Sequence, residues 1–203
     1  MPYKSSVDIA LYDVQGSGEY KLGAGYFAEA LIKYNFNDRY SIFSGINYNV
    51  STIKLHSAVS VTEFSGKLHK TYMSLPLMFK VKAFESVPLG ISLGTYVGFL
   101  LSAKEKGDIY MDRFIGGGGT LFSFPEPMHL EYDDDIKENF TSHDFGISLQ
   151  LDYEFKLNDK LKAVALSRFN YGLKDVASYD ESVLANTRKW RNYSIMLGVG
   201  VKI

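Results

Sequence analysis

The last eleven residues of the chain read Tyr193-Ser194-Ile195-Met196-Leu197-Gly198-Val199-Gly200-Val201-Lys202-Ile203. Every second side chain is apolar or aromatic, and the side chains between them are mostly small, polar or charged. Because successive side chains of a β-strand point to opposite faces, this period of two predicts a strand with one apolar face. A soluble sandwich rarely needs strands this long and this regular. Since the same pattern recurs along the chain, we predict a transmembrane β-barrel.

The composition is consistent with one small barrel. With 203 residues the chain is long enough for a single domain, which we assign to residues 1–203. The net charge of -1 gives no indication of a nucleic-acid partner, and the absence of cysteine excludes a disulfide framework. Met1-Pro2-Tyr3-Lys4 leads directly into polar sequence, so we expect that a signal peptide is absent from this chain because it has been removed.

Eight segments of the chain show the alternating pattern. Their approximate bounds are 7–13, 20–36, 39–55, 67–84, 88–104, 142–157, 160–173 and 190–203. The connections alternate between short turns, such as Asn37-Asp38 and Asn158-Asp159, and longer segments, of which 105–141 is the longest. This asymmetry is typical of bacterial outer-membrane barrels, which have short periplasmic turns and longer extracellular loops. We therefore predict an all-β, eight-stranded, antiparallel up-and-down barrel that is integral to the outer membrane.

The charged residues of these segments decide which face is inside. A Lys or Arg that faces the middle of the bilayer costs about 2–4 kcal/mol. Turned inward, acids and bases from different strands can pair, which is the condition for burying them. Because eight strands leave room only for side chains, we predict a polar plug and no open channel. The predicted interior network is Lys21, Glu29, Lys33, Lys80, Lys82, Asp152, Glu154, Lys162 and Arg168.

Aromatic residues on the opposite face are expected to form interfacial girdles where they lie near the segment ends. They are Tyr26, Tyr34, Tyr40, Tyr48, Tyr153, Phe155, Tyr171 and Tyr193. The alternative is aromatic packing in a soluble, lipocalin-like barrel. That fold needs an apolar interior for its ligand, and the charged alternate rows argue against it.

Several stretches are similar to one known family. Gly25-Tyr26-Phe27-Ala28-Glu29-Ala30 followed by Asn37-Asp38-Arg39-Tyr40-Ser41-Ile42 resembles the first long hairpin of PorT-like outer-membrane β-barrel proteins of Gram-negative bacteria. Tyr72-Met73-Ser74-Leu75-Pro76-Leu77-Met78-Phe79-Lys80 is similar to that family's Tyr-x-x-x-Pro-Leu-x-x-Lys strand. The resemblance implies the barrel fold and a location in the outer membrane of the cell envelope. It does not assign a role in secretion to any residue of this chain. The C-terminal segment is also similar to the signal read by the outer-membrane insertion machinery, with Ile203 in place of the usual aromatic residue.

Candidate chemistry is sparse. Ser142-His143-Asp144 places three catalytic residue types in succession, but adjacent strand residues point to opposite faces and cannot form a triad. The acidic run Asp133-Asp134-Asp135 does not match a standard calcium loop, and we interpret it as a solvated segment. The histidines, among them His129, are scattered, so we predict no catalytic, cofactor-binding or metal-binding residue. Pro76 should mark a bulge or an unpaired carbonyl, because proline lacks the amide donor.

The connection 105–141 is the best functional lead, because it is too apolar for a freely solvated loop. It either folds over the barrel mouth or presents an apolar patch to a partner or to lipopolysaccharide. The candidate contact residues are Phe114, Leu121, Phe122 and Phe124.

The sequence favours a non-enzymatic outer-membrane protein that acts structurally or through its extracellular loops. Passage of a small or apolar solute through a gated barrel is the first alternative, and a lipid-modifying barrel enzyme is the second. We expect a monomer without a cofactor, surrounded by outer-membrane lipid.

Overall fold

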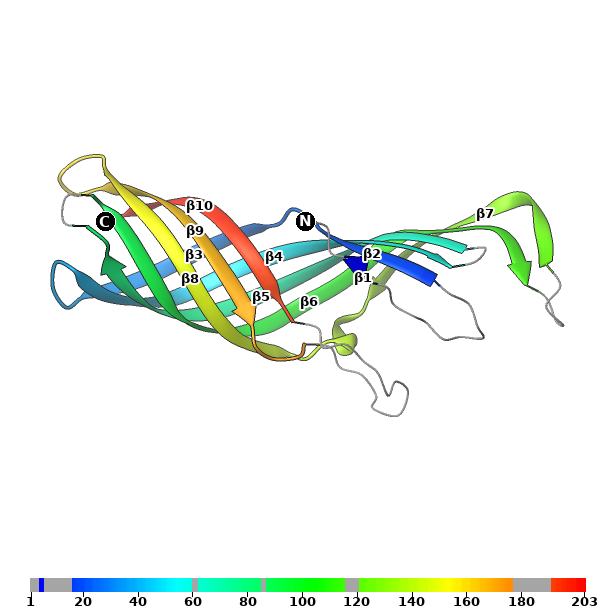
Figure 1. The fold of residues 1–203 in the computed structure, drawn as a ribbon, viewed down its shortest axis with the longest axis horizontal. Helices are drawn as coiled ribbons and strands as arrows, with labels where there is room; N and C mark the ends of the chain where they lie inside the picture. Colours follow the sequence, from blue (N-terminus) through cyan, green and yellow to red (C-terminus); the bar gives the residue numbers. More distant parts are fainter. Residues whose placement is uncertain (1–3, 6–15, 60–61, 85–86, 116–120, 177–190) are drawn as a thin grey trace. The chain divides into compact units, whose positions relative to one another are not determined.

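A computed structural model of the chain describes residues 4–5, 16–59, 62–84, 87–115, 121–176 and 191–203. Among these residues it contains ten strands and one 3-10 turn (Figure 1). The elements are β1 (Lys4–Ser5), β2 (Gly16–Leu22), β3 (Tyr26–Asn35), β4 (Tyr40–Val59), β5 (Thr62–Lys82), β6 (Leu89–Ile115), β7 (Leu121–Asp135), the 3-10 turn (Lys137–Asn139), β8 (His143–Lys156), β9 (Lys162–Gly172) and β10 (Tyr193–Lys202). No helix in this described part is long and apolar enough to span a membrane. The predicted segment 7–13 lies outside it.

The strands form one antiparallel sheet. Its hydrogen-bonded path runs β1-β2-β4-β5-β6-β8-β9-β10, while β3 pairs with β4 and β7 pairs with β6. The path contains eight strands, which confirms the predicted all-β, eight-stranded antiparallel fold. The predicted segment 20–36 is divided into β2 and β3 by residues 23–25, where Gly23 and Gly25 lie close against Thr52 and Val50.

The chain divides into two compact units. Unit 1 comprises residues 1–25, 50–70 and 102–137, and unit 2 comprises residues 26–49, 71–101 and 138–203. Each unit is described separately below.

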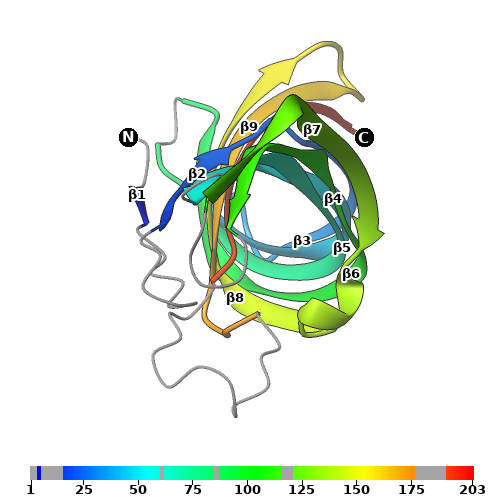
Figure 2. The same ribbon diagram turned by 90° about the vertical axis from the view of Figure 1, so that its right-hand side faces the viewer.

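Unit 2 is a sheet that curls strongly around its inner face (Figure 2). In the described part it contains β3, β8, β9, β10 and portions of β4, β5 and β6. The curl brings β3 near β9, since Arg168 of β9 donates a hydrogen bond of 2.7 Å to Glu29 of β3. Along β8, buried and exposed residues alternate: Gln150 is 4% exposed and Leu149 is 46% exposed. The polar row is therefore inside and the apolar row is outside, as the charges predict.

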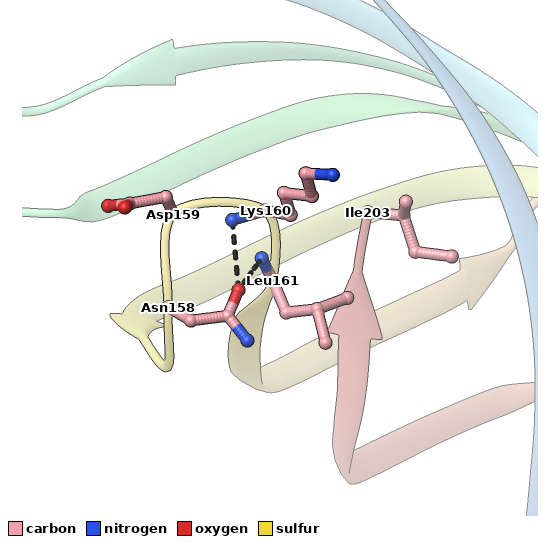
Figure 3. A pocket seen from close by; sticks show the side chains of 5 residues that line it. All are labelled: Asn158, Asp159, Lys160, Leu161 and Ile203. Carbon is pink, nitrogen blue, oxygen red and sulfur yellow. Dashed lines mark hydrogen bonds between the residues drawn. The ribbon is translucent and has the colours of Figure 1, made fainter.

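The short turns close one end of unit 2, which we call the short-turn end. The Asn37 side chain accepts hydrogen bonds from the backbone amides of Arg39 and Tyr40. Asn158 repeats this arrangement with the amides of Lys160 and Leu161, at 2.9 and 2.8 Å (Figure 3). An asparagine side chain that accepts hydrogen bonds from following backbone amides mimics a backbone turn. This explains why such short connections can join neighbouring strands here. The shallow pocket beside Asn158 is lined by this turn and by Ile203, and most of its side chains are exposed.

Aromatic residues lie toward both ends of the outer face of unit 2. Near the short-turn end, Tyr40 stacks on Phe79 with ring centroids 5.9 Å apart. Toward the other end, Tyr26 and Tyr48 lie 6.5 Å apart. Tyr40 and Tyr48 are eight residues apart on β4, which is about 27 Å along a strand and about 20 Å along the membrane normal at a tilt of roughly 40°. This height is comparable to the apolar band of an outer-membrane barrel, about 25 Å.

Pro76 lies on β5, where its side chain is buried in unit 2. The hydroxyl of Ser44 on β4 donates a hydrogen bond of 2.7 Å to the Pro76 carbonyl. A side chain of the neighbouring strand therefore provides a hydrogen bond to the carbonyl of the proline itself.

Unit 1 corrects the prediction of a long irregular loop at 105–141. β6 continues to Ile115, and β7 returns beside it with Lys104 opposite Asp135 and Ile115 opposite Leu121. The sequence obscured this hairpin because Pro125 and Pro127 argue against a strand and because the register shifts between Met111 and Arg113.

A pair of glycine substitutions in unit 2 tests this fold. A Cβ on Gly94 would overlap the Leu77 carbonyl, whereas a Cβ on Gly200 would meet no atom within 4 Å. We expect Gly94→Ala to destabilise the barrel by about 1–3 kcal/mol through overpacking, and Gly200→Ala to leave it unchanged. The measurement is the heat-modified gel shift of the refolded protein during urea titration. Equal midpoints for the two variants would contradict the packing of β5 against β6.

Candidate functional site

The interior of unit 2 contains a layer built around Arg168. This side chain is 2% exposed, and its Nη1 and Nη2 donate to the two carboxylate oxygens of Glu29 at 2.7 and 3.3 Å. Its Nε donates to Gln150 at 2.8 Å, and Asn47 donates to Glu29 at 3.3 Å. The bidentate geometry between Arg and carboxylate is the strongest arrangement for a buried charge pair. It joins β3 to β9 across the interior.

A second layer lies nearer the short-turn end and is centred on Glu154. The Lys80 ammonium donates to Glu154 at 3.0 Å and also to Asp152. Lys202 lies 3.0 Å from Glu154, and the remaining two lysines of the layer, Lys162 and Lys33, lie 3.5 and 3.9 Å from it. Four ammonium groups from four strands therefore surround two carboxylates.

Hydrogen bonds between neutral side chains fill the space beside the charged layers. Ser74 donates to Asn47 at 3.4 Å, and Ser148 donates to Asn170 at 2.6 Å. Asn170 in turn donates to Ser194 at 3.3 Å. Because buried polar groups are tolerated when they are paired, these contacts help the polar side chains to pack inside unit 2.

A third cluster is formed by Asp144, Tyr96, Asn192 and Tyr72. Asp144 is 2% exposed and accepts hydrogen bonds of 3.0 Å from both the Tyr96 hydroxyl and the Asn192 amide. Asn192 also donates to the Tyr72 hydroxyl at 3.1 Å. His143 is exposed and contacts Ser142 and Lys174. The three successive residues Ser142, His143 and Asp144 thus face different surroundings, in agreement with the expectation that they cannot form a triad.

The remaining residues of the predicted network have other surroundings. Lys82 is half-buried in β5, and its backbone amide donates to the Arg39 carbonyl at 2.9 Å. Lys21 belongs to unit 1, where it is exposed and lies opposite Lys54 in the pairing of β2 with β4. The structure therefore brings seven of the nine predicted residues into the two charged layers, while Lys21 lies in unit 1 and Lys82 is half-buried on β5.

The candidate contact residues lie on the hairpin of unit 1. Phe122 is 45% exposed on β7, and Phe124 is half-buried. Phe114 lies opposite Phe122 in the pairing of β6 with β7, and Leu121 lies opposite Ile115. The structure does not describe the side chains of Phe114 and Leu121. Exposed apolar residues that were not among the predicted contacts are Tyr110, Met128 and Leu130.

His129 is less isolated than its position in the sequence indicates. Its Nε2 lies 3.0 Å from a carboxylate oxygen of Asp108. Asp108, His129 and Glu131 each have one possible metal-ligand atom, and these three atoms lie within 4.8 Å of one another. All three side chains are exposed. The register of the hairpin, with Asp108 opposite Glu131, creates this group, and sequence separation concealed it.

Several interior residues were not assigned to the network from the sequence, chiefly Gln150, Asn47, Tyr96 and Asp144. Each lies on the inward row of its strand, so the period of two places it on the correct face. The missing information is the register between strands, which determines which of these side chains meet.

A protein-family model described as an outer membrane protein beta-barrel domain matches residues 3–203. No curated protein and no solved structure matches the chain.

The Arg168 layer yields a stability prediction. Arg168→Met leaves the Glu29 carboxylate buried without its partner, so we expect the free energy of unfolding to fall by about 3–5 kcal/mol. The double variant Glu29→Gln/Arg168→Met removes both charges and should recover a large part of this loss. The measurement is urea unfolding in lipid vesicles.

Arg113→Met is the control, because the ion pair of Arg113 with Asp112 is exposed and contributes about 0–1 kcal/mol. A loss for Arg168→Met no larger than that of the control would show that the interior layer does not stabilise the barrel.

Proposed function

Because the chain belongs to the outer membrane protein β-barrel domain family, we propose that it is a non-enzymatic outer-membrane barrel with a plugged interior that acts through its hairpin of β6 and β7. The observation that carries the first part is the filling of unit 2 by buried side chains that pair with one another. Arg168 and Asp152 are 2% and 3% exposed, and both have charged partners. A path for solutes would require these layers to separate, which costs the pairing energy of several charges.

The similarity to PorT-like proteins is part of this proposal. The strand Tyr72 to Lys80 has the Tyr-x-x-x-Pro-Leu-x-x-Lys pattern, and the buried position of Pro76 and the ion pairs of Lys80 give two of its residues structural roles. These roles concern the barrel itself, and they support the fold part of the resemblance without extending it to secretion.

The hairpin of β6 and β7 is the proposed contact surface. Its exposed apolar residues include Phe122, Met128 and Leu130, at 45%, 37% and 47% exposure. On the other face of the hairpin, Lys106 pairs with Asp133 at 2.6 Å. Contiguous exposed apolar residues with a polar surround are characteristic of binding surfaces. We propose lipopolysaccharide as the contact of this surface.

A conductance measurement tests the plugged interior. We expect the protein refolded in planar bilayers to show no steady single-channel conductance, together with a heat-modified gel shift that proves folding. The variant Glu29→Ala/Arg168→Ala removes the pair that crosses the interior, and it should open intermittently. Steady conductance of the unmodified protein would overturn the plug and make solute passage the leading function.

A binding measurement tests the hairpin. We expect Phe122→Ser/Met128→Ser/Leu130→Ser to weaken binding to lipopolysaccharide micelles by at least tenfold, because the apolar contact area is lost. Glu126→Ser, on the same strand and also exposed, is the matched control and should bind normally. Unchanged binding of the triple variant, or no binding by the unmodified protein, would exclude this surface.

A further inference from the structure

The hairpin of β6 and β7 in unit 1 brings together three side chains of the types that bind metal ions. Asp108 lies directly opposite Glu131 in the pairing of the two strands, and His129 precedes Glu131 by two residues. Residues that lie opposite each other, or two apart on one strand, point to the same face of a sheet. The register of the backbone therefore places all three side chains on one face of the hairpin.

The spacing of the possible ligand atoms is close to that of a metal site. The Nε2 of His129 lies 3.0 Å from a carboxylate oxygen of Asp108. Two ligand atoms that are each about 2.0–2.1 Å from a tetrahedral zinc ion lie about 3.3 Å apart. The group as a whole spans up to 4.8 Å between ligand atoms, and its three side chains are exposed. Small side-chain rotations can therefore bring the third ligand, Glu131, to the same spacing.

The two carboxylates of this group lack a positive charge between them. Like charges directly opposite each other on neighbouring strands destabilise a sheet. The adjacent row on the same face contains opposite charges, because Lys106 lies opposite Asp133 and forms an ion pair of 2.6 Å. Within the described part of the chain, neither Asp108 nor Glu131 forms an ion pair with a Lys or Arg. A cation bound between the two carboxylates would supply the missing charge.

The ligand types indicate which kind of cation fits. An imidazole nitrogen suits zinc and other transition metals, whereas calcium and magnesium take oxygen ligands. Two carboxylates and one neutral imidazole together carry a charge that a divalent cation balances. His129 ligates through Nε2 when its proton is on Nδ1, so the bond to the metal replaces the contact of Nε2 with Asp108. Zinc with three protein ligands keeps a fourth position for water.

We propose that Asp108, His129 and Glu131 bind one zinc ion, which links β6 to β7 and offsets the repulsion between the two carboxylates. This site goes beyond the proposed contact with lipopolysaccharide. Met128 and Leu130 alternate with His129 and Glu131 along β7, so they point to the opposite face of the hairpin. The two proposals concern different faces and can fail separately.

Isothermal titration calorimetry of the refolded full chain in detergent micelles tests the site, with zinc chloride as the probe and no affinity tag on the protein. We expect one zinc ion per chain. His129→Asn and Glu131→Gln should each weaken zinc binding by about tenfold or more, because each variant removes one of three ligands. The heat-modified gel shift checks that each variant is folded.

Two control variants remove the same residue types outside the group. His143→Asn removes another exposed histidine, whose described side-chain contacts are with Ser142 and Lys174. Glu126→Gln removes an exposed carboxylate of the same strand, β7. Both controls should bind zinc as tightly as the unmodified protein.

Glu131→Lys separates the effect of zinc from the folding of the hairpin. The new lysine lies opposite Asp108 and gives this row the same kind of ion pair as Lys106 with Asp133, so the hairpin should remain folded while zinc binding is lost. Hydrogen exchange of the backbone amides of β6 and β7 provides the second measurement. Zinc should slow this exchange in the unmodified protein and leave it unchanged in Glu131→Lys.

The other outcomes overturn the proposal. Absence of zinc binding by the unmodified protein, or unchanged binding by His129→Asn and Glu131→Gln, would show that this group holds no zinc. An equal loss in His143→Asn would show that zinc binds elsewhere on the chain. Calcium binding as tight as zinc binding would show an acidic surface in which the imidazole takes no part.

Discussion

The exclusion of water and charge from the hydrocarbon layer is the constraint on which this structure depends. Every charged side chain in the spanning part of a strand has to face inward, because an outward Lys or Arg costs about 2–4 kcal/mol at the middle of the bilayer. β8 shows the result: Leu149 and Leu151 are outside, and Gln150 and Asp152 are inside. The inward charges then require partners, and the curl of the sheet supplies them from distant strands. Arg168 and Glu29 are 139 residues apart in the chain and form a bidentate pair.

The same constraint connects the interior to the proposed function. A polar interior can conduct only where its groups are hydrated, and the layers around Arg168 and Glu154 use their hydrogen-bonding capacity on one another. In the proposed function, the plugged barrel holds other surfaces at the membrane. In unit 1, the hairpin of β6 and β7 carries exposed apolar residues on strands, which present a more fixed surface than a loop would. The Tyr132 hydroxyl on this hairpin donates to Glu105 at 3.0 Å, and burial together with that carboxylate raises the pKa of Tyr132.

The sequence was sufficient for the features that depend on a period of two. The antiparallel all-β fold, the inward row of charges and the turns at Asn37 and Asn158 follow from local patterns, because each strand residue has only two faces and each short turn has few permitted residue types. The hairpin of unit 1 was missed because Pro125 and Pro127 interrupt the pattern on β7. The partners within the interior, such as Gln150 for Arg168, depend on strand register, which single strands do not encode.

Spin-label accessibility along β8 tests the central claim most directly, since cysteines can be introduced one at a time from Phe145 to Tyr153 in a chain that has none. In lipid bilayers, we predict that collision with molecular oxygen, which concentrates in the hydrocarbon, is high at Phe145, Ile147, Leu149, Leu151 and Tyr153. It should be low at the positions between them, with little access for a water-soluble nickel complex at either set. Uniform access of the nickel complex to the intervening positions would show a hydrated interior, and the loss of the two-residue period would contradict the barrel itself.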